Sequence, residues 1–509
     1  MPGMNARTLA GIATACAFAL SSPARPTVLA TLEHATLEQA ECTSLTTLEL
    51  PDVKVSEAVA VPAPASGAVR VAHCRVNGVV GTEIRFALLM PDTWNHKLMM
   101  GGGGGFVSGI DNQALSSIND GYATVATDTG HQGGVTSAAW ALNHPERQLN
   151  FGHLAVHRVA GVAKAIIRAH YGSNETRSYF SGCSNGGRQA LMEAQRYPED
   201  FDGIVAGAPA NDFLGIGAQF IKDLQAAFPD PAAVSTPTFP NDLLKSIEAQ
   251  IVEKCDAIDG VKDGLMDDPR TCKVDVATLS GLSDAQKRAL RAIYAETRNK
   301  DGLIYPGQPV GGEGDANGWP LWIVGANPML LAAQKTPSLR FAFGTEMFKN
   351  FVFSDPAWDY SRFDFADFRR RTAKAGAILN ATDPNLSRFK ARGGKLVIWH
   401  GWSDPALTPL GSIKYYEQVQ ARDRKARDFA RMFMMPGVLH CFGGPGPDQA
   451  DWAAVIDGWV EKGQAPERVI ASKRTAGAVS RTRPLCAYPK RAVYSGTGSI
   501  DDEKSFVCK

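Results

Sequence analysis

One stretch of the sequence decides the fold: Tyr179-Phe180-Ser181-Gly182-Cys183-Ser184-Asn185-Gly186. Its apolar start predicts a strand, and residues 188–197, which precede Pro198, predict a helix. A serine between two glycines at a strand-to-helix turn projects from a sharp bend, because larger flanking side chains would collide with neighbouring backbone. We therefore predict that Ser184 is a nucleophile held on such a turn.

The sequence on both sides of this turn alternates between strand and helix patterns. Apolar side chains at i, i+3 and i+4 predict a helix at 156–171. Strands that alternate with helices indicate an α/β protein with a mainly parallel sheet covered on both faces. Together with the serine turn, this pattern predicts the α/β-hydrolase fold. The predicted strands lie within 67–90 and at 98–100, 123–126, 203–206, 395–399 and 431–435.

The strand rhythm stops after Pro209 and returns at residue 395. Two or three further strand-plus-helix units, at roughly 30 residues each, fill only part of this gap. Because long insertions on a rigid scaffold usually cover a binding site, we expect an inserted lid. The expected divisions are a leader at 1–30, the first part of the hydrolase core at 31–210, the lid at 211–388 and the second part of the core at 389–509.

Two histidines follow Ser184 in the sequence, His400 and His440. The α/β-hydrolase fold carries its catalytic residues in the order serine, acid, histidine. His400 precedes the best acid candidate, Asp404, so it cannot follow that acid. This leaves His440 as the base, with Asp404 and His440 each just beyond the carboxyl end of a predicted strand, where such sites form. The alternatives are a solvated loop aspartate and a structural histidine.

Five consecutive glycines, 101–105, follow the predicted strand at 98–100. Such a run permits close approach of the backbone to a ligand, although a flexible turn is the alternative. We expect the oxyanion formed when Ser184 attacks an ester to accept hydrogen bonds from the N–H groups of Asn185 and Gly102. His440 would take the serine proton, Asp404 would orient the imidazole, and water would then release the acyl group.

The charge balance and the N-terminus bear on partners and location. The chain has 53 basic and 52 acidic residues, mixed along its length, which gives no field to attract nucleic acid or an anionic membrane. A small-molecule substrate is therefore expected. Arg7, an apolar run at 9–20 and then small residues predict a signal peptide and a periplasmic or secreted protein. A frayed apolar terminus and a lipoprotein attached through Cys16 are the alternatives.

Nine cysteines occur, and removal of a leader that contains Cys16 leaves eight. An even number in an exported chain predicts four disulfides. Local spacing favours two pairs, and a third is favoured because contact between Ser184 and His440 would bring their neighbours within the Cα separation of about 5.5 to 6 Å that a disulfide needs. These pairs are Cys255 with Cys272, Cys486 with Cys508, and Cys183 with Cys441.

Five aspartates lie between Cys255 and Cys272, in a stretch that also contains glycines. Carboxylates that alternate with exposed carbonyls, with glycines for tight turns, are typical of calcium-binding loops. The EF-hand spacing is not met, and a solvated acidic turn is the alternative. Such an ion would be structural and would hold the shape of the lid.

Four motifs together resemble those of one protein family, and the resemblance runs from about Cys42 to Cys508. They are Gly182-Cys-Ser-Asn-Gly-Gly187-Arg-Gln, Asp202-Gly-Ile-Val-Ala-Gly-Ala-Pro209, His400-Gly-Trp-Ser-Asp404 and His440-Cys-Phe-Gly-Gly444-Pro-Gly. These motifs resemble the tannase/feruloyl esterase family, which also includes the hydrolase of mono(2-hydroxyethyl) terephthalate. The resemblance implies a triad of Ser184, Asp404 and His440, with oxyanion donors at Gly102 and Asn185.

The resemblance has further implications for the disulfides and for a metal ion. It implies the same three cysteine pairs as above and a fourth, Cys42 with Cys74. Family members with an extra lid disulfide exist, whereas this chain has no cysteine between 272 and 441. A structural calcium ion in the lid is also implied, held by the side chains of Asp256, Asp259 and Asp263 and by the carbonyls of Val261 and Leu265.

The leading functional hypothesis is a serine esterase that releases phenolic acids from feruloyl and other hydroxycinnamoyl esters. A tannase acting on galloyl esters and a terephthalate monoester hydrolase are the alternatives, because substrate choice in the family lies in the lid. From another class, an inactive ligand-binding relative is disfavoured by the intact triad. Four lid aromatics either face a phenolic acyl group or form the core of the lid: Phe348, Phe351, Trp358 and Tyr360.

Overall fold

The computed structural model describes residues 41–325, 327, 330, 332 and 336–509. The leader expected at 1–30 lies outside these residues. In the described part of the chain, no helix is both long enough and apolar enough to cross a bilayer.

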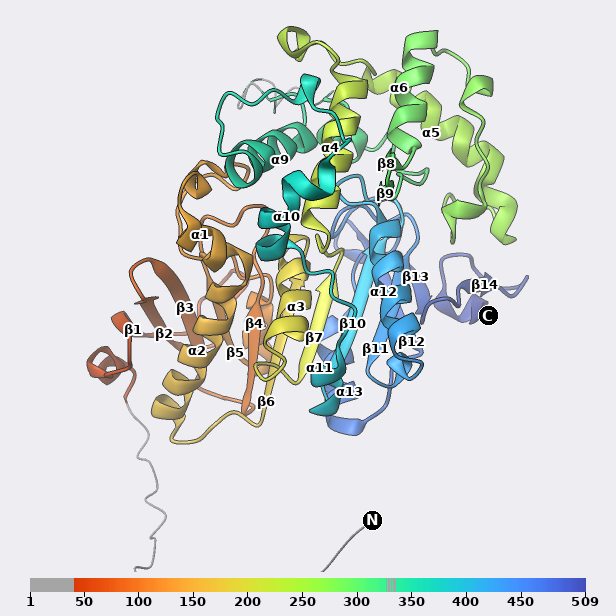
Figure 1. Ribbon diagram of the computed structural model, residues 1–509. Coiled ribbons are helices and arrows are strands. Elements are labelled where there is room, and N and C mark those ends of the chain that lie inside the picture. Colours follow the sequence, from red (N-terminus) through yellow and green to blue (C-terminus); the bar gives the residue numbers. More distant parts are fainter. Residues whose placement is uncertain (1–40, 326, 328–329, 331, 333–335) are drawn as a thin grey trace, which may run out of the picture. The chain divides into compact units, whose positions relative to one another are not determined.

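A nine-stranded sheet runs through the described chain in the order β1-β2-β3-β5-β4-β6-β7-β10-β11 (Figure 1). Pairs from β1 to β5 are antiparallel, and pairs from β5 to β11 are parallel. The mainly parallel sheet was predicted, but β1 was not, and residues 67–72 precede β2 rather than belong to it. The strands are β1 (Val53–Val61), β2 (His73–Val80), β3 (Ile84–Pro91), β4 (Lys97–Gly101), β5 (Ala123–Thr127), β6 (Arg177–Cys183), β7 (Gly203–Gly207), β10 (Lys395–Gly401) and β11 (Ala430–Met435).

Helices cover both faces of this sheet because alternate strand side chains point to opposite sides. Leu396 and Ile398 of β10 belong to the apolar cluster that contains residues of α2, α3 and α12. Val397 and Trp399 belong instead to the cluster that contains residues of α13. This two-sided cover and the strand order confirm the predicted α/β class. The helices are α2 (Ala155–Tyr171), α3 (Asn185–Arg196), α12 (Pro409–Arg422) and α13 (Trp452–Lys462).

The chain between β7 and β10 adds no strand to the large sheet in its described part. The lid is expected at 211–388, within this segment, which we call the lid below. It is more helical than its irregular sequence suggests. In Figure 1 most of this segment lies above the end of the sheet at which β7 ends, whereas α11 lies at the opposite end, where the parallel strand β10 begins. Its elements are α4 (Phe213–Ala227), α5 (Asn241–Cys255), α6 (Asp284–Tyr294), β8 (Thr297–Asn299), β9 (Gly302–Tyr305), α7 (Trp319–Trp322), α9 (Leu339–Met347), α10 (Phe368–Leu379) and α11 (Ser387–Ala391).

Four disulfides close the described chain, and they are the four predicted pairs. Their Cα atoms lie between 5.5 and 6.0 Å apart. Two join cysteines close in sequence near the C-terminus and in the lid, and one joins segments 258 residues apart. They are Cys42–Cys74, Cys183–Cys441, Cys255–Cys272 and Cys486–Cys508.

The C-terminal segment forms two small hairpins outside the large sheet. The first lies beside the acidic loop of the lid, because Arg483 on its second strand pairs with Asp263. The strands are β12 (Arg468–Thr475), β13 (Ala478–Cys486), β14 (Ala492–Tyr494) and β15 (Phe506–Cys508).

Candidate active site

Ser184 occupies the turn between β6 and α3, as the sequence predicts. Its backbone has φ 64° and ψ −123°, a conformation that non-glycine residues rarely adopt, so the residue is strained. A Cβ atom added to Gly182 would lie 2.7 Å from the carbonyl carbon of Gly186, and one added to Gly186 would lie 2.3 Å from the Gln113 side-chain oxygen, so both flanking positions need glycine. The Ser184 N–H donates to the Gly207 carbonyl on β7 at 3.0 Å, which anchors the turn to the sheet.

Asp404 and His440 meet beyond the ends of β10 and β11. The Nδ1 of His440 lies 2.8 Å from Oδ2 of Asp404, and the aspartate is fully buried. Two backbone N–H groups, from Ala406 and Leu407, donate to the other carboxylate oxygen at 2.8 and 2.9 Å. This bonding leaves Nε2 as the ring nitrogen of His440 that is free to serve as a base.

A second imidazole, which was not predicted to lie here, contacts the same carboxylate. Nε2 of His400 lies 3.0 Å from Oδ2 of Asp404, and its Nδ1 lies 2.8 Å from the Ser412 hydroxyl. Burial opposes ionisation of Asp404, but the two imidazoles, His440 first, hold the pKa of that carboxyl well below its usual range. The four-residue spacing from His400 to Asp404 was the available signal; it served only to exclude His400 as the base.

A chain of buried polar groups supports Asp404 from the lid side. The Gln308 amide donates to the Asp404 backbone carbonyl at 2.8 Å, and Arg340 donates to the Gln308 side-chain oxygen at 2.8 Å. Arg340 also pairs with Asp223 of α4, and both side chains are fully buried. The lid therefore fixes the position of the acid, which no sequence motif indicated.

The Cys183–Cys441 disulfide joins the residue before Ser184 to the residue after His440. Its Cα atoms are 6.0 Å apart, so the backbones of the two loops are held next to each other. Ser184 and His440 line one cavity of about 380 Å³. The structure therefore brings together all three residues of the predicted triad.

The wall of this cavity is mostly apolar and comes from both the core and the lid. Trp322 packs edge-on against the His440 ring at a centroid distance of 5.1 Å and stacks on Phe343 at 6.1 Å. Phe442, which follows the disulfide, is 73% exposed at the cavity. The aromatic lining is Phe106, Phe213, Phe220, Trp322, Phe343 and Phe442.

The four lid aromatics that the sequence singled out do not line this cavity. Phe348, Phe351 and Tyr360 are buried, and Phe348 stacks on Trp358 at 5.1 Å. They belong to an apolar cluster with α4 and α10. Of the two roles left open, they therefore form the core of the lid.

The oxyanion donors agree with expectation at one position and differ at the other. Asn185 is the first residue of α3, where the backbone N–H has no partner within the helix, and it lines the cavity. The N–H of Gly102 instead donates to the Ser181 carbonyl at 2.9 Å, which extends the pairing of β4 with β6 by one bond. The Gly102 N–H is therefore not free to bind the oxyanion as predicted, because it forms a hydrogen bond within the sheet. Later in the run, Gly104 and Gly105 line the cavity.

The acidic loop of the lid is folded around its own backbone. Asp256 accepts from the N–H groups of Asp263 and Gly264, and Asp259 accepts from those of Val261 and Asp267. No three acidic side chains are gathered into a ready-made metal cluster in the described part of the chain.

Calcium takes oxygen ligands, and this loop supplies carboxylate and carbonyl oxygens, although the Asp263 carboxylate already pairs with Arg483. Both carboxylate oxygens of Asp267 are buried without a hydrogen-bond partner among the described residues. Burial raises the pKa of Asp267 to about 7, whereas Arg483 lowers it. A carboxylate in this setting gains from a nearby positive charge, of which Arg483 supplies one.

Comparison with known proteins identifies the family. The model of the tannase and feruloyl esterase family matches residues 68–509. The chain belongs to this family. An uncharacterised esterase of Xanthomonas campestris pv. campestris is 34% identical, over 92% of this chain and 91% of that protein. The mono(2-hydroxyethyl) terephthalate hydrolase of Piscinibacter sakaiensis is 32% identical, over 88% and 87%.

A solved structure agrees with these relatives. Feruloyl esterase B from Aspergillus oryzae superposes with a TM-score of 0.82 at 26% identity and covers 92% of this chain and 100% of that one. The protein is accordingly a carboxylic ester hydrolase with the α/β fold of this family.

Proposed function

We propose that the protein is a serine esterase that releases phenolic acids, hydroxycinnamates first, through an acyl-enzyme on Ser184. One observation carries the proposal: Ser184 and His440 line the same apolar cavity, and Asp404 holds His440 by a 2.8 Å bond to Nδ1. This arrangement supplies a nucleophile, a base and an orienting acid in the roles that acyl transfer needs.

The reaction has two steps. Nε2 of His440 takes the proton of Ser184 as its oxygen attacks the ester carbonyl, and the protonated imidazole then gives that proton to the departing alcohol. Water attacks the acyl-enzyme by the same route and releases the acid and free Ser184. The Asn185 N–H would stabilise the oxyanion together with a donor from the glycine run. The N–H groups of Gly103 and Gly104 already donate to Gln189 and Asp111, so the second donor would be that of Gly105, which lines the cavity.

The cavity supports an aromatic acyl group. Its volume of about 380 Å³ and its aromatic lining fit a planar ring, which packs well between Trp322, Phe343 and Phe213. Likeness to a structure named feruloyl esterase B favours a hydroxycinnamate. A terephthalate monoester is the second candidate, supported by the 32% identity to the hydrolase of that ester. A galloyl ester is the third, supported by the family description.

The test is hydrolysis of methyl ferulate, methyl gallate and mono(2-hydroxyethyl) terephthalate by the purified chain and by Ser184→Ala. We expect the highest kcat/KM on methyl ferulate and a loss of at least about a thousandfold in Ser184→Ala. Preference for either other ester would replace the substrate assignment. Hydrolysis unchanged in Ser184→Ala, with no labelling by a serine-directed phosphonate, would sink the nucleophile itself.

Two further proposals concern the metal and the location. We propose that Asp256, Asp259 and Asp263, with the carbonyls of Val261 and Leu265, hold a structural calcium ion. We also propose export through the leader at 1–30, supported by the four disulfides, since such bonds persist in oxidising compartments. N-terminal sequencing of the mature protein checks the leader: a chain that still begins at Met1 would contradict it.

A further inference from the structure

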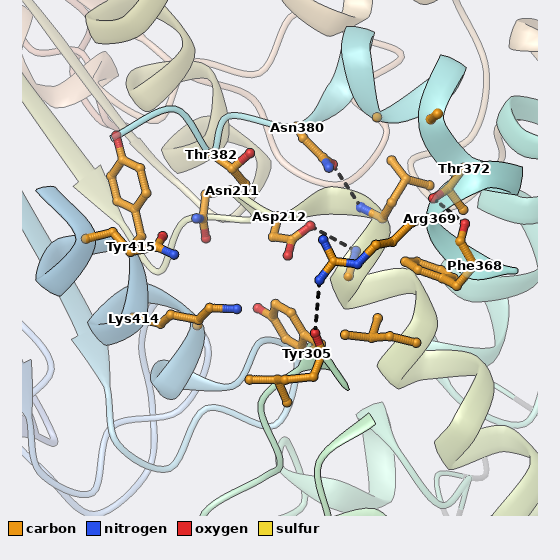
Figure 2. A pocket seen from close by; sticks show the side chains of 18 residues that line it. Asn211, Asp212, Tyr305, Phe368, Arg369, Thr372, Asn380, Thr382, Lys414 and Tyr415 are labelled. Atoms are coloured by element: carbon orange, nitrogen blue, oxygen red, sulfur yellow. Dashed lines mark hydrogen bonds between the residues drawn. The ribbon is translucent and has the colours of Figure 1, made fainter. Parts of the chain in front are cut away.

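A second cavity, of about 500 Å³, lies where the lid meets the core (Figure 2). Its walls come from the start of α4, from β9, from α10 and from α12. None of the triad residues lines it. It is larger than the cavity at Ser184, and its lining carries charged and amide groups rather than a cluster of phenylalanines.

Two cations and one carboxylate face this cavity. Lys414 of α12 and Arg369 of α10 form no ion pair within the described chain, although both act electrostatically on Asp212. Asp212 caps α4 by accepting from the Gly215 N–H at 3.1 Å. Figure 2 shows the guanidinium of the exposed Arg369 near Asp212, with one of its N–H groups donating to the Leu303 carbonyl at 3.5 Å. The ammonium of Lys414 points towards Tyr305. The cavity therefore has an excess of one positive charge, which suits a ligand with one negative charge.

Neutral polar groups complete the lining. The side-chain oxygen of Asn211, a residue only 3% exposed, is buried without a hydrogen-bond partner in the described structure. Buried polar atoms are seldom left unpaired, so a donor from a ligand or water is expected there. The Tyr305 hydroxyl points towards Lys414 in Figure 2. A Cβ atom at Gly411 would lie 2.4 Å from that hydroxyl, so glycine on α12 leaves room for it.

Ring surfaces lie beside these polar groups. Tyr305, Tyr415 and Phe368 line the cavity together with Leu214 and Ile304. Aromatic faces next to hydrogen-bonding groups suit a ligand that has both C–H faces and hydroxyls. A simple anion such as phosphate would use the cations and leave these surfaces and most of the volume without a contact.

We propose that this cavity binds a sugar acid: a small polyhydroxylated ring that carries one carboxylate, such as a hexuronic acid. Lys414 and Arg369 bind the carboxylate. Asp212, Asn211 and the Tyr305 hydroxyl bind the ring hydroxyls, and the aromatic side chains pack against the C–H face of the ring. Binding requires no reaction at Ser184, so this proposal can be tested independently of the proposed esterase function.

The test is isothermal titration calorimetry of the full chain with D-glucuronate. D-Glucose is the control ligand that lacks the carboxylate, and acetate is the control ligand that lacks the ring. We expect saturable binding of glucuronate, with glucose and acetate each at least about tenfold weaker, because a charge-assisted bond and the ring contacts both contribute. Saturable binding of glucuronate should persist after inactivation of Ser184 with a phosphonate, because none of the triad residues lines this cavity.

Substitutions locate the site. Lys414→Met and Arg369→Met should each weaken glucuronate about tenfold or more, whereas Lys374→Met, an exposed cation on the same helix as Arg369, should not. Three results would each overturn the proposal. They are the absence of saturable binding, a Kd unaffected by both cavity substitutions, and a Kd for glucose or acetate equal to that of glucuronate. Loss of binding after phosphonate labelling would also overturn it, by placing the ligand in the catalytic cavity.

Discussion

The disulfide between Cys183 and Cys441 is expected to position the catalytic groups, and the double variant Cys183→Ala/Cys441→Ala tests this. The bond closes a loop of 258 residues, so loop-closure entropy assigns it about 5 to 6 kcal/mol. Cys255→Ala/Cys272→Ala is the matched control. That bond closes a loop of 17 residues, for which the same relation gives about 3 kcal/mol.

The melting temperature and kcat should both differ between these two double variants. For a chain of this length about 1 kcal/mol shifts the melting temperature by about 1 °C, so falls of about 6 °C and 3 °C are expected. Only loss of the Cys183–Cys441 bond frees the loop that carries His440 from the Ser184 turn. We expect kcat to fall at least about tenfold in that variant, because small misplacements of catalytic groups are costly. In the control it should stay within about twofold.

The assay is kcat and KM on whichever ester of the panel reacts fastest, at a temperature well below both melting transitions. Mass spectrometry of the intact chain verifies that the other three disulfides have formed. Wild-type kcat in Cys183→Ala/Cys441→Ala, with the remaining bonds intact, would refute the reasoning, because the positions of Ser184 and His440 would then be fixed without the bond. An equal loss in the control would attribute the effect to general destabilisation.

Three further outcomes are expected. His400→Leu removes one of the two imidazoles on Asp404 and should lower kcat about tenfold with KM nearly unchanged in steady-state kinetics. Burial raises the pKa of Glu313 from 4.5 to about 7, so stability is lost as pH rises through that window, by about 3 kcal/mol. Glu313→Gln should flatten the fall of melting temperature between about pH 4.5 and 7, and an unchanged pH profile would contradict this. Chelation should lower the melting temperature, added calcium should restore it, and kcat should stay constant; an unaltered melting curve would count against the ion.

The sheet was predictable where strands are buried on both faces. Residues 203–207 and 396–399 are continuous apolar runs, as parallel strands covered by helices require. β1 was missed because it pairs only with β2 at the edge of the sheet and buries just two of its nine residues, so no alternation is visible. α4 was missed for the opposite reason: it is buried nearly all round, and a helix without a polar face has no amphipathic period.

The positions of the triad residues followed from their order in the chain, and the disulfide beside two of them followed from adjacency. The wall of the cavity did not, because Trp322, Phe343 and Phe213 reach it from separate lid segments that no local pattern connects. The wrong placement of Gly102 has a similar origin. In a run of five glycines the sequence does not show which residue donates the last hydrogen bond between β4 and β6.

The start of α4 belongs to both cavities. Ala210, Phe213 and Ile216 line the cavity at Ser184, whereas Asn211 and Asp212 between them line the second cavity. The Ala210 N–H also donates to the Ser184 carbonyl at 3.0 Å, so this segment is bonded directly to the nucleophile turn. A ligand that binds Asp212 would therefore contact the same backbone segment that forms part of the wall of the cavity at Ser184. If this ligand changes the affinity of the protein for the ester, the bound ester must change the affinity for this ligand by the same factor.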